Sequence, residues 1–221
     1  MQSIFDLLTQ YEIFSKLRPS QLNYLSINSS FVRIGRNNYL QKSRKMVYFL
    51  VSGKIKVCEL APDGEEVIKY ILTEGNFFGE SVNNLCSHGN EFAKGTEYSV
   101  VVAIPKLLLD ETIGLVPDFA SEYSKLTIKK CGTIENQLRT LMLKDRKERL
   151  VRFLELMAMN EGRMVNDKLI VRNYLTHSDI ASLIGATRVT VTKFLNELKL
   201  SGKISYSRRE FQLPVSLINL V

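Results

Sequence analysis

Residues 178–195, SDIASLIGATRVTVTKFL, restrict the possible fold more than any other part of the sequence. Apolar side chains at 180, 183 and 184 form one face of a short helix, which Ser178 is predicted to cap. Gly185 follows where the chain must leave that helix, a position that favours a left-handed residue. Thr187 is predicted to cap a second helix, whose inner face carries apolar residues at 191, 194, 195 and 198. The pattern predicts a helix-turn-helix.

The outward side of the second predicted helix is basic and polar. In a helix-turn-helix that binds DNA, the first turns of this helix enter the major groove. Arg188 suits a bidentate contact with guanine, and Val189 suits a thymine methyl group. The predicted DNA-contacting set in this motif is Ser178, Thr187, Arg188, Val189, Thr190, Thr192 and Lys193. An ordinary helical hairpin in an enzyme core is the alternative, and the outward basic residues count against it.

A β-hairpin is predicted over residues 204–213, with Arg208 and Arg209 near its turn. These two side chains would hold DNA phosphates, as a wing does. Lys and Arg outnumber Asp and Glu by 30 to 23, for a net charge of +7, and residues 145–221 carry 13 against 8. This excess suits a polyanionic partner, although a merely basic surface would give the same count.

The N-terminal half has a different texture. Residues 3–27 contain two short helical patterns, which are interrupted at Arg18 and Pro19. From 31 to about 104, short β-rich runs alternate with turn residues, as at 52–53 and 62–64. Short strands at this spacing predict an antiparallel β-roll or jelly-roll barrel.

A long helix is predicted over residues 118–142. A seam of residues spaced by fours and threes runs along it: Ala120, Ser124, Thr127, Cys131, Ile134, Leu138 and Leu141. A helix of ~25 residues would reach about 37 Å, which is longer than a small barrel needs for cover. Dimerisation through this seam is therefore favoured over burial of the seam within one chain. Another amphipathic helix is predicted over 145–160, before two short strands.

The sequence resembles the Crp/Fnr regulators over nearly its whole length. The resemblance rests on Gly75-Asn76-Phe77-Phe78-Gly79-Glu80, which is similar to their effector-binding β-roll, and on TxxDIAxxIGxTRxTVxK from Thr176 to Lys193, which is similar to their DNA-reading unit. It implies an α+β fold with three parts: an N-terminal sensor β-roll (1–115), a central dimerisation helix (116–144) and a C-terminal winged helix-turn-helix (145–221). The implied partners are an inverted-repeat DNA duplex, a second copy of the chain and RNA polymerase.

The sensor departs from the pattern of the family. Members that bind cyclic nucleotides hold the phosphate with Arg-Ser-Ala, where this chain has Glu91, Phe92 and Ala93. A carboxylate would repel that phosphate, so we expect an effector other than cAMP, apolar or aromatic, between the roll and the central helix. The predicted effector-binding residues are Phe78, Gly79, Glu80, Ser81, Val82, Phe92, Ile134 and Leu138. Two alternatives are a regulator without an effector and a thiol or haem sensor that uses Cys86 or His88.

Other classes of protein find little support. Three scattered cysteines form no CxxC pair, the N-terminal cysteine cluster of iron–sulfur regulators is missing, and no catalytic constellation or metal site is recognisable. We therefore expect neither an enzyme nor a cofactor. No apolar run approaches the ~20 residues of a membrane span, and residues 1–10 do not resemble a signal peptide, so a cytoplasmic protein is expected.

The recognition helix also departs from the pattern of the family. Val189 stands where many relatives have Glu, which predicts an operator richer in A·T.

Overall fold

The computed structural model describes residues 3–79, 91–143 and 145–218. The chain divides into two compact units, Met1–Gly132 and Thr133–Val221, and the division falls within one long helix.

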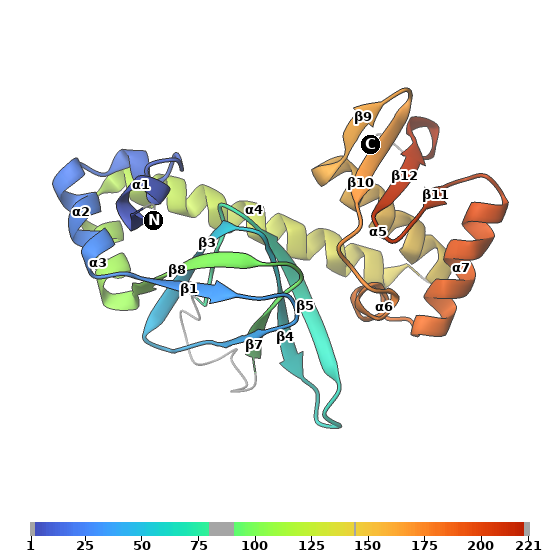
Figure 1. The fold of residues 1–221 in the computed structure, drawn as a ribbon, viewed down its shortest axis with the longest axis horizontal. Coiled ribbons are helices and arrows are strands. Elements are labelled where there is room, and N and C mark those ends of the chain that lie inside the picture. Colours follow the sequence, from blue (N-terminus) through green and yellow to red (C-terminus); the bar gives the residue numbers. More distant parts are fainter. Residues whose placement is uncertain (1–2, 80–90, 144, 219–221) are drawn as a thin grey trace. The chain divides into compact units, whose positions relative to one another are not determined.

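The first unit contains two four-stranded antiparallel sheets (Figure 1). One has the order β1-β8-β3-β6, in which Phe49 lies opposite Val102, and the other has the order β2-β7-β4-β5, in which Val57 lies opposite Ala93. The strands of the first sheet are β1 (Ser30–Ile34), β8 (Ser99–Pro105), β3 (Met46–Ser52) and β6 (Phe77–Phe78). Those of the second are β2 (Tyr39–Gln41), β7 (Glu91–Gly95), β4 (Lys54–Leu60) and β5 (Glu66–Thr73). The predicted antiparallel roll is confirmed.

Strand β3 is buried on both faces, which explains its almost unbroken apolar sequence. Tyr48 and Leu50 point into the core between the two sheets. Val47, Phe49 and Val51 point the other way, into a second core that the helices cover. The helices of this unit are α1 (Ile4–Leu8), α2 (Pro19–Ile27), α3 (Lys106–Leu115) and the first part of α4 (Pro117–Met142), with a 3₁₀ turn at Phe14–Lys16. Helix α3 was not predicted.

Helix α4 corresponds closely to the predicted long helix. Most of its predicted seam is exposed in the single chain, including Cys131 and Ile134, and Leu138 is 58% exposed. Ile128 and Met142, which flank the seam, are 70% and 75% exposed. These apolar side chains find no cover within the part of the chain that the structure describes.

The second unit is a small α+β domain. Its elements are α5 (Arg146–Glu161), β9 (Arg163–Val165), β10 (Lys168–Arg172), α6 (His177–Ile184), α7 (Arg188–Leu200), β11 (Ser205–Tyr206), β12 (Glu210–Pro214) and a 3₁₀ turn at Val215–Leu217. The strands form one antiparallel sheet in the order β11-β12-β10-β9. Buried side chains from α5, α6, α7 and β12, such as Leu150, Ile180, Leu195 and Phe211, form its core. No helix among the described residues is both long and apolar enough to cross a membrane.

Candidate nucleic-acid interface

Helix α6 begins with a capping box formed by Thr176 and Asp179. The Asp179 N–H donates to the Thr176 hydroxyl at 3.1 Å, and the Thr176 N–H donates to the Asp179 carboxylate at 2.9 Å. The prediction that Ser178 caps this helix was therefore wrong. Ser178 is an exposed residue inside the first turn. Thr176 replaces it because only a start at Thr176 places an acidic side chain three residues later, where it can bond back to the cap.

The turn between α6 and α7 confirms the other two local predictions. Gly185 adopts the left-handed conformation, with φ 62° and ψ 47°, and its N–H donates to the Ala181 carbonyl. Thr187 caps α7, because its hydroxyl accepts the Thr190 N–H at 3.2 Å. The Arg149 guanidinium braces this turn from α5, donating to the carbonyl oxygens of Leu143 at 2.7 Å and Ile184 at 3.3 Å.

Helix α7 separates an apolar inner side from a basic outer side. Val191, Leu195 and Leu198 are buried against the rest of the unit. Arg188 and Lys193 are exposed on the first two turns, and Val189 is 77% exposed. Arg188 and Val189 are thus exposed next to each other at the start of α7, and side chains of these types can contact a guanine and a thymine methyl group.

The threonines of α7 are less open than the sequence suggested. Thr190 is half-buried, and its hydroxyl is within 2.8 Å of the Thr187 hydroxyl. The Thr192 hydroxyl donates to the Arg188 carbonyl at 2.9 Å and lies 2.8 Å from Nδ1 of His177. His177 itself is half-buried. No local signal indicates this contact, because the two residues are fifteen positions apart.

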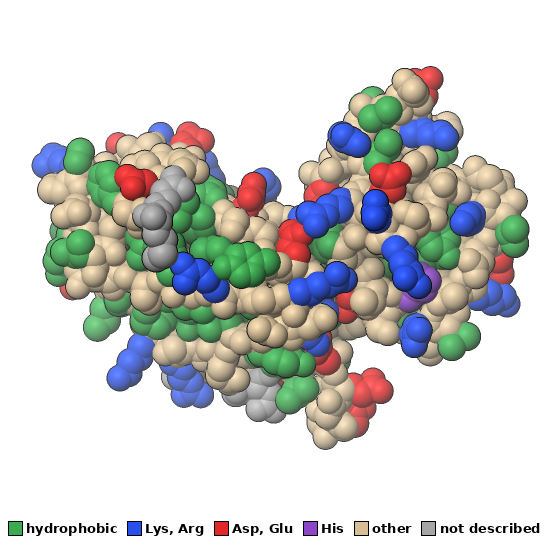
Figure 2. Space-filling model, viewed as in Figure 1, with side chains coloured by type: hydrophobic (Ala, Val, Ile, Leu, Met, Phe, Trp, Pro, Cys, Tyr) green, Lys and Arg blue, Asp and Glu red, His purple; other side chains and the backbone are tan. Residues whose placement is uncertain are grey.

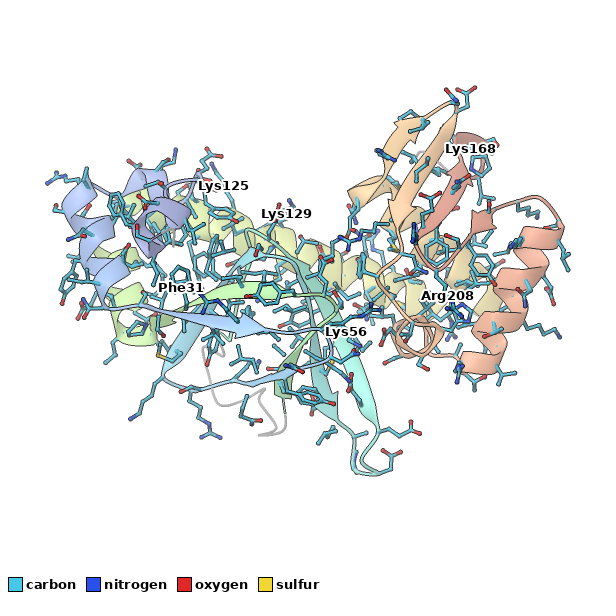
Figure 3. The ribbon with its side chains drawn as sticks, viewed as in Figure 1. Phe31, Lys56, Lys125, Lys129, Lys168 and Arg208 are labelled. Carbon is cyan, nitrogen blue, oxygen red and sulfur yellow. The ribbon has the colours of Figure 1, made fainter. Side chains whose placement is uncertain are left out.

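The hairpin β11–β12 places Arg208 (labelled in Figure 3) and Arg209 in an exposed turn. Ser207 organises the turn, since its hydroxyl accepts the N–H groups of Arg209 at 3.1 Å and Glu210 at 3.2 Å. Asn173 holds the turn from the segment before α6, donating its N–H to the Arg209 carbonyl at 2.8 Å. Figure 2 shows several Lys and Arg side chains gathered over this part of the second unit. The second unit thus contains both a hairpin with a basic turn and a helix, α7, with a basic outward side.

Two known protein-family models match the chain, one within the first unit and one within the second. The model of the cyclic nucleotide-binding domain matches residues 39–113, and that of the Crp-like helix-turn-helix domain matches residues 148–215. The global nitrogen regulator of Nostoc sp. is 31% identical over 180 residues, which cover 77% of this chain and 78% of that protein. The chain belongs to the Crp/Fnr family of transcription regulators. It is therefore a DNA-binding transcription regulator, and its α6 and α7 are the helix-turn-helix of that family.

Other similar proteins cover more of the chain at lower identity. The CRP-like cAMP-activated global transcriptional regulator of Mycobacterium tuberculosis is 26% identical over 204 residues, 90% of each chain. Among solved structures, a CooA variant from Carboxydothermus hydrogenoformans has a TM-score of 0.74 at 21% identity, covering 98% of this chain and 93% of that one. A cyclic nucleotide-binding domain containing protein from Listeria monocytogenes has a TM-score of 0.72 at 16% identity and covers 98% of both chains. These structures show the same fold.

Within the first unit, the predicted effector-binding residues Phe78, Gly79 and Phe92 have different surroundings. Phe78 is fully buried between the sheets and stacks on Tyr48, with ring centroids 5.1 Å apart. Gly79 has φ 82°, and a Cβ there would lie 2.8 Å from the Tyr48 ring, so only glycine fits. Phe92 packs on Tyr39, on the sheet face opposite to Ala93 and the inner core. Ile134 and Leu138 are exposed residues of the second unit, and Glu80, Ser81, Val82, Cys86 and His88 lie outside the described residues.

Glu91 is neutralised by lysines of the roll. Its carboxylate forms ion pairs with Lys42 and, at 3.1 Å, with Lys69, and the Lys42 and Glu91 side chains are only 10% and 11% exposed. These pairs join Glu91 of β7 to Lys69 of β5 and to Lys42, the residue that follows β2. The ammonium groups of Lys42 and Lys69 are therefore already paired with Glu91, where a cyclic phosphate would need a cation.

A second ion-pair group occupies the outer face of the same sheet. Lys94 Nζ lies 2.6 Å from the Glu66 carboxylate, and the buried Lys56 lies 3.8 Å from it. Burial and the neighbouring Glu66 raise the pKa of the Cys58 thiol to about 12. Cys58 therefore stays a protonated thiol, which is unsuited to redox sensing.

Proposed function

We propose that this Crp/Fnr regulator acts as a homodimer that reads an inverted-repeat operator with the first turns of α7. The observation that carries the proposal is the exposed pair Arg188 and Val189 at the start of a helix whose other side is buried. In this proposal Arg188 contacts a guanine and Val189 a thymine methyl group, while Lys193, Arg208 and Arg209 hold phosphates.

The exposed seam of α4 supports the dimer. Ile134, Leu138 and the flanking Ile128 and Met142 leave an apolar stripe uncovered along a helix of 26 residues. A second α4 related by a two-fold axis would cover that stripe by knobs-into-holes packing. Two recognition helices would then meet half-sites about 34 Å apart, the spacing that helix-turn-helix dimers require, for which known members of this family are among the standard examples.

We further propose that a small molecule other than cAMP controls DNA binding by favouring one arrangement of the dimer, and that RNA polymerase is the downstream partner. The effector site would be in the sensor roll, at the end where Phe78 and Gly79 lie. The ion pairs of Glu91 with Lys42 and Lys69 support the exclusion of a cyclic phosphate. A thermal-shift screen of metabolites tests the effector, and a roll that no compound stabilises would indicate a regulator without one.

Binding selection from randomised duplexes, at two salt concentrations, tests the DNA-reading proposal. Arg188→Ala should lose preference at one G·C pair per half-site, at a cost of about 1–3 kcal/mol. Arg208→Ala should weaken binding to all duplexes alike and reduce the salt slope by about one unit. Val189→Glu should shift the adjacent pair toward cytosine. An unchanged motif with Arg188→Ala and an altered one with Arg208→Ala would reverse these roles.

A further inference from the structure

His177 stands where three elements of the DNA-binding unit meet. It is the first residue of α6, its Nδ1 lies 2.8 Å from the Thr192 hydroxyl of α7, and its ring centroid lies 6.2 Å from that of Tyr206 on β11. Tyr206 in turn donates its hydroxyl to Asn196 of α7 at 2.7 Å. His177 thus contacts the recognition helix and the hairpin at once.

The direction of the hydrogen bonds around Thr192 follows from its single hydroxyl proton. That proton is donated to the Arg188 carbonyl at 2.9 Å, so the Thr192 oxygen accepts from His177. This pattern assigns the proton of the neutral imidazole to Nδ1, a tautomer inferred from the two hydrogen bonds of Thr192. The result is a chain of donors from the imidazole, through Thr192, to the backbone of Arg188.

The electrostatic setting agrees with a neutral imidazole. Burial, and to a smaller degree the positive charge of Arg188, lower the pKa of His177. A neutral ring has a single N–H, and Thr192 uses it. The Thr192 hydroxyl has no proton left to donate, so Thr192 is not available as a donor to a phosphate or a base.

From this geometry we propose that His177 is a positioning residue for base reading. Through Thr192 it fixes the first turn of α7, and with it the angle at which Arg188 meets its base pair. The inference rests on the proposed role of Arg188 and adds a specificity determinant outside the contact surface. It also moves Thr192 from the predicted DNA contacts to the support of Arg188.

The variants that test this separate the hydrogen bond from the bulk of the ring. His177→Ala removes the donor, whereas His177→Asn retains an N–H close to the position of Nδ1. Thr192→Val removes the hydroxyl with little change of shape, and Thr192→Ser is its control because it keeps the hydroxyl. The full-length protein is measured on its selected duplex and on a duplex with the Arg188 base pair exchanged. Circular dichroism establishes that each variant is folded.

His177→Ala and Thr192→Val should each lower discrimination between the two duplexes by about 3- to 10-fold, as expected for one net hydrogen bond. The double variant should lose no more than either single one, and His177→Asn and Thr192→Ser should retain most of the discrimination. Additive losses, failure of His177→Asn to restore discrimination, or an equal loss of affinity for both duplexes would overturn the inference. The last result would make His177 a phosphate contact. If the wild type itself shows no discrimination at that pair, the proposed role of Arg188 fails instead.

Discussion

Replacing Gly185 by Ala tests the turn on which the helix-turn-helix depends. Gly185 has φ 62°, and an L-residue in this conformation costs about 1–2 kcal/mol. The smaller conformational freedom of Ala in the unfolded chain offsets about 0.4–1 kcal/mol of that cost. The new Cβ would also lie 3.2 Å from Arg149 Nη1, which already donates to the Ile184 carbonyl at 3.3 Å. Weakening that bond adds about 1 kcal/mol, so we expect a total loss of about 2 kcal/mol.

Gly202 provides the matched control. It too follows a helix, with φ 69°, but a Cβ there meets no atom within 4 Å. Gly202→Ala should therefore show only the backbone share, about 1 kcal/mol. Urea unfolding of the full chain, followed by circular dichroism, gives both values. In an Arg149→Ala background the two glycine variants should become equal. Equal losses in the wild-type background would refute the Arg149 contact, and a neutral Gly185→Ala would refute the left-handed turn.

Three further predictions concern the cap, the dimer and the effector. Thr176→Ala should lower the free energy of unfolding by about 1 kcal/mol, whereas Ser178→Ala should change it by less than about 0.5 kcal/mol. Urea unfolding measures both values, and a larger loss for Ser178→Ala than for Thr176→Ala would show that Ser178 is the cap. Leu138→Asp places a charge in the exposed seam of α4 and should give a monomer in sedimentation. The control Leu107→Asp, on the exposed side of α3, should remain a dimer. If both variants are dimers, the seam is not the dimer interface. Calorimetry should detect no cAMP binding, because Glu91 stands where a phosphate-holding Arg would be needed, and micromolar affinity would contradict this.

The sequence predicted best what depends on neighbouring residues. The left-handed Gly185, the Thr187 cap and the apolar side of α7 follow from local chemistry within a few positions. The cap of α6 was misplaced because two candidate residues lie two positions apart, and only the Asp179 side chain decides between them. Helix α3 was missed, since its ten residues bury only Leu109 and give little amphipathic signal.

Contacts across long sequence separations could not be predicted. The ion pair between Lys42 and Glu91 joins residues 49 positions apart, and the contact of His177 with Thr192 depends on how two helices cross. Such pairs depend on tertiary packing, which periodicity and composition do not encode. Residues that support the site through such long-range contacts, such as His177, are therefore harder to predict from sequence than the exposed residues of α7.

The mass of the protein–DNA complex tests the central proposal most directly. A duplex with the selected inverted repeat and a duplex with one half-site are each mixed with the full-length protein and examined by sedimentation equilibrium. We expect two chains on the inverted repeat and much weaker binding to the single half-site, because both recognition helices of the dimer must be engaged. One chain per inverted repeat, or equal affinity for the two duplexes, would contradict a dimer that reads DNA through α7.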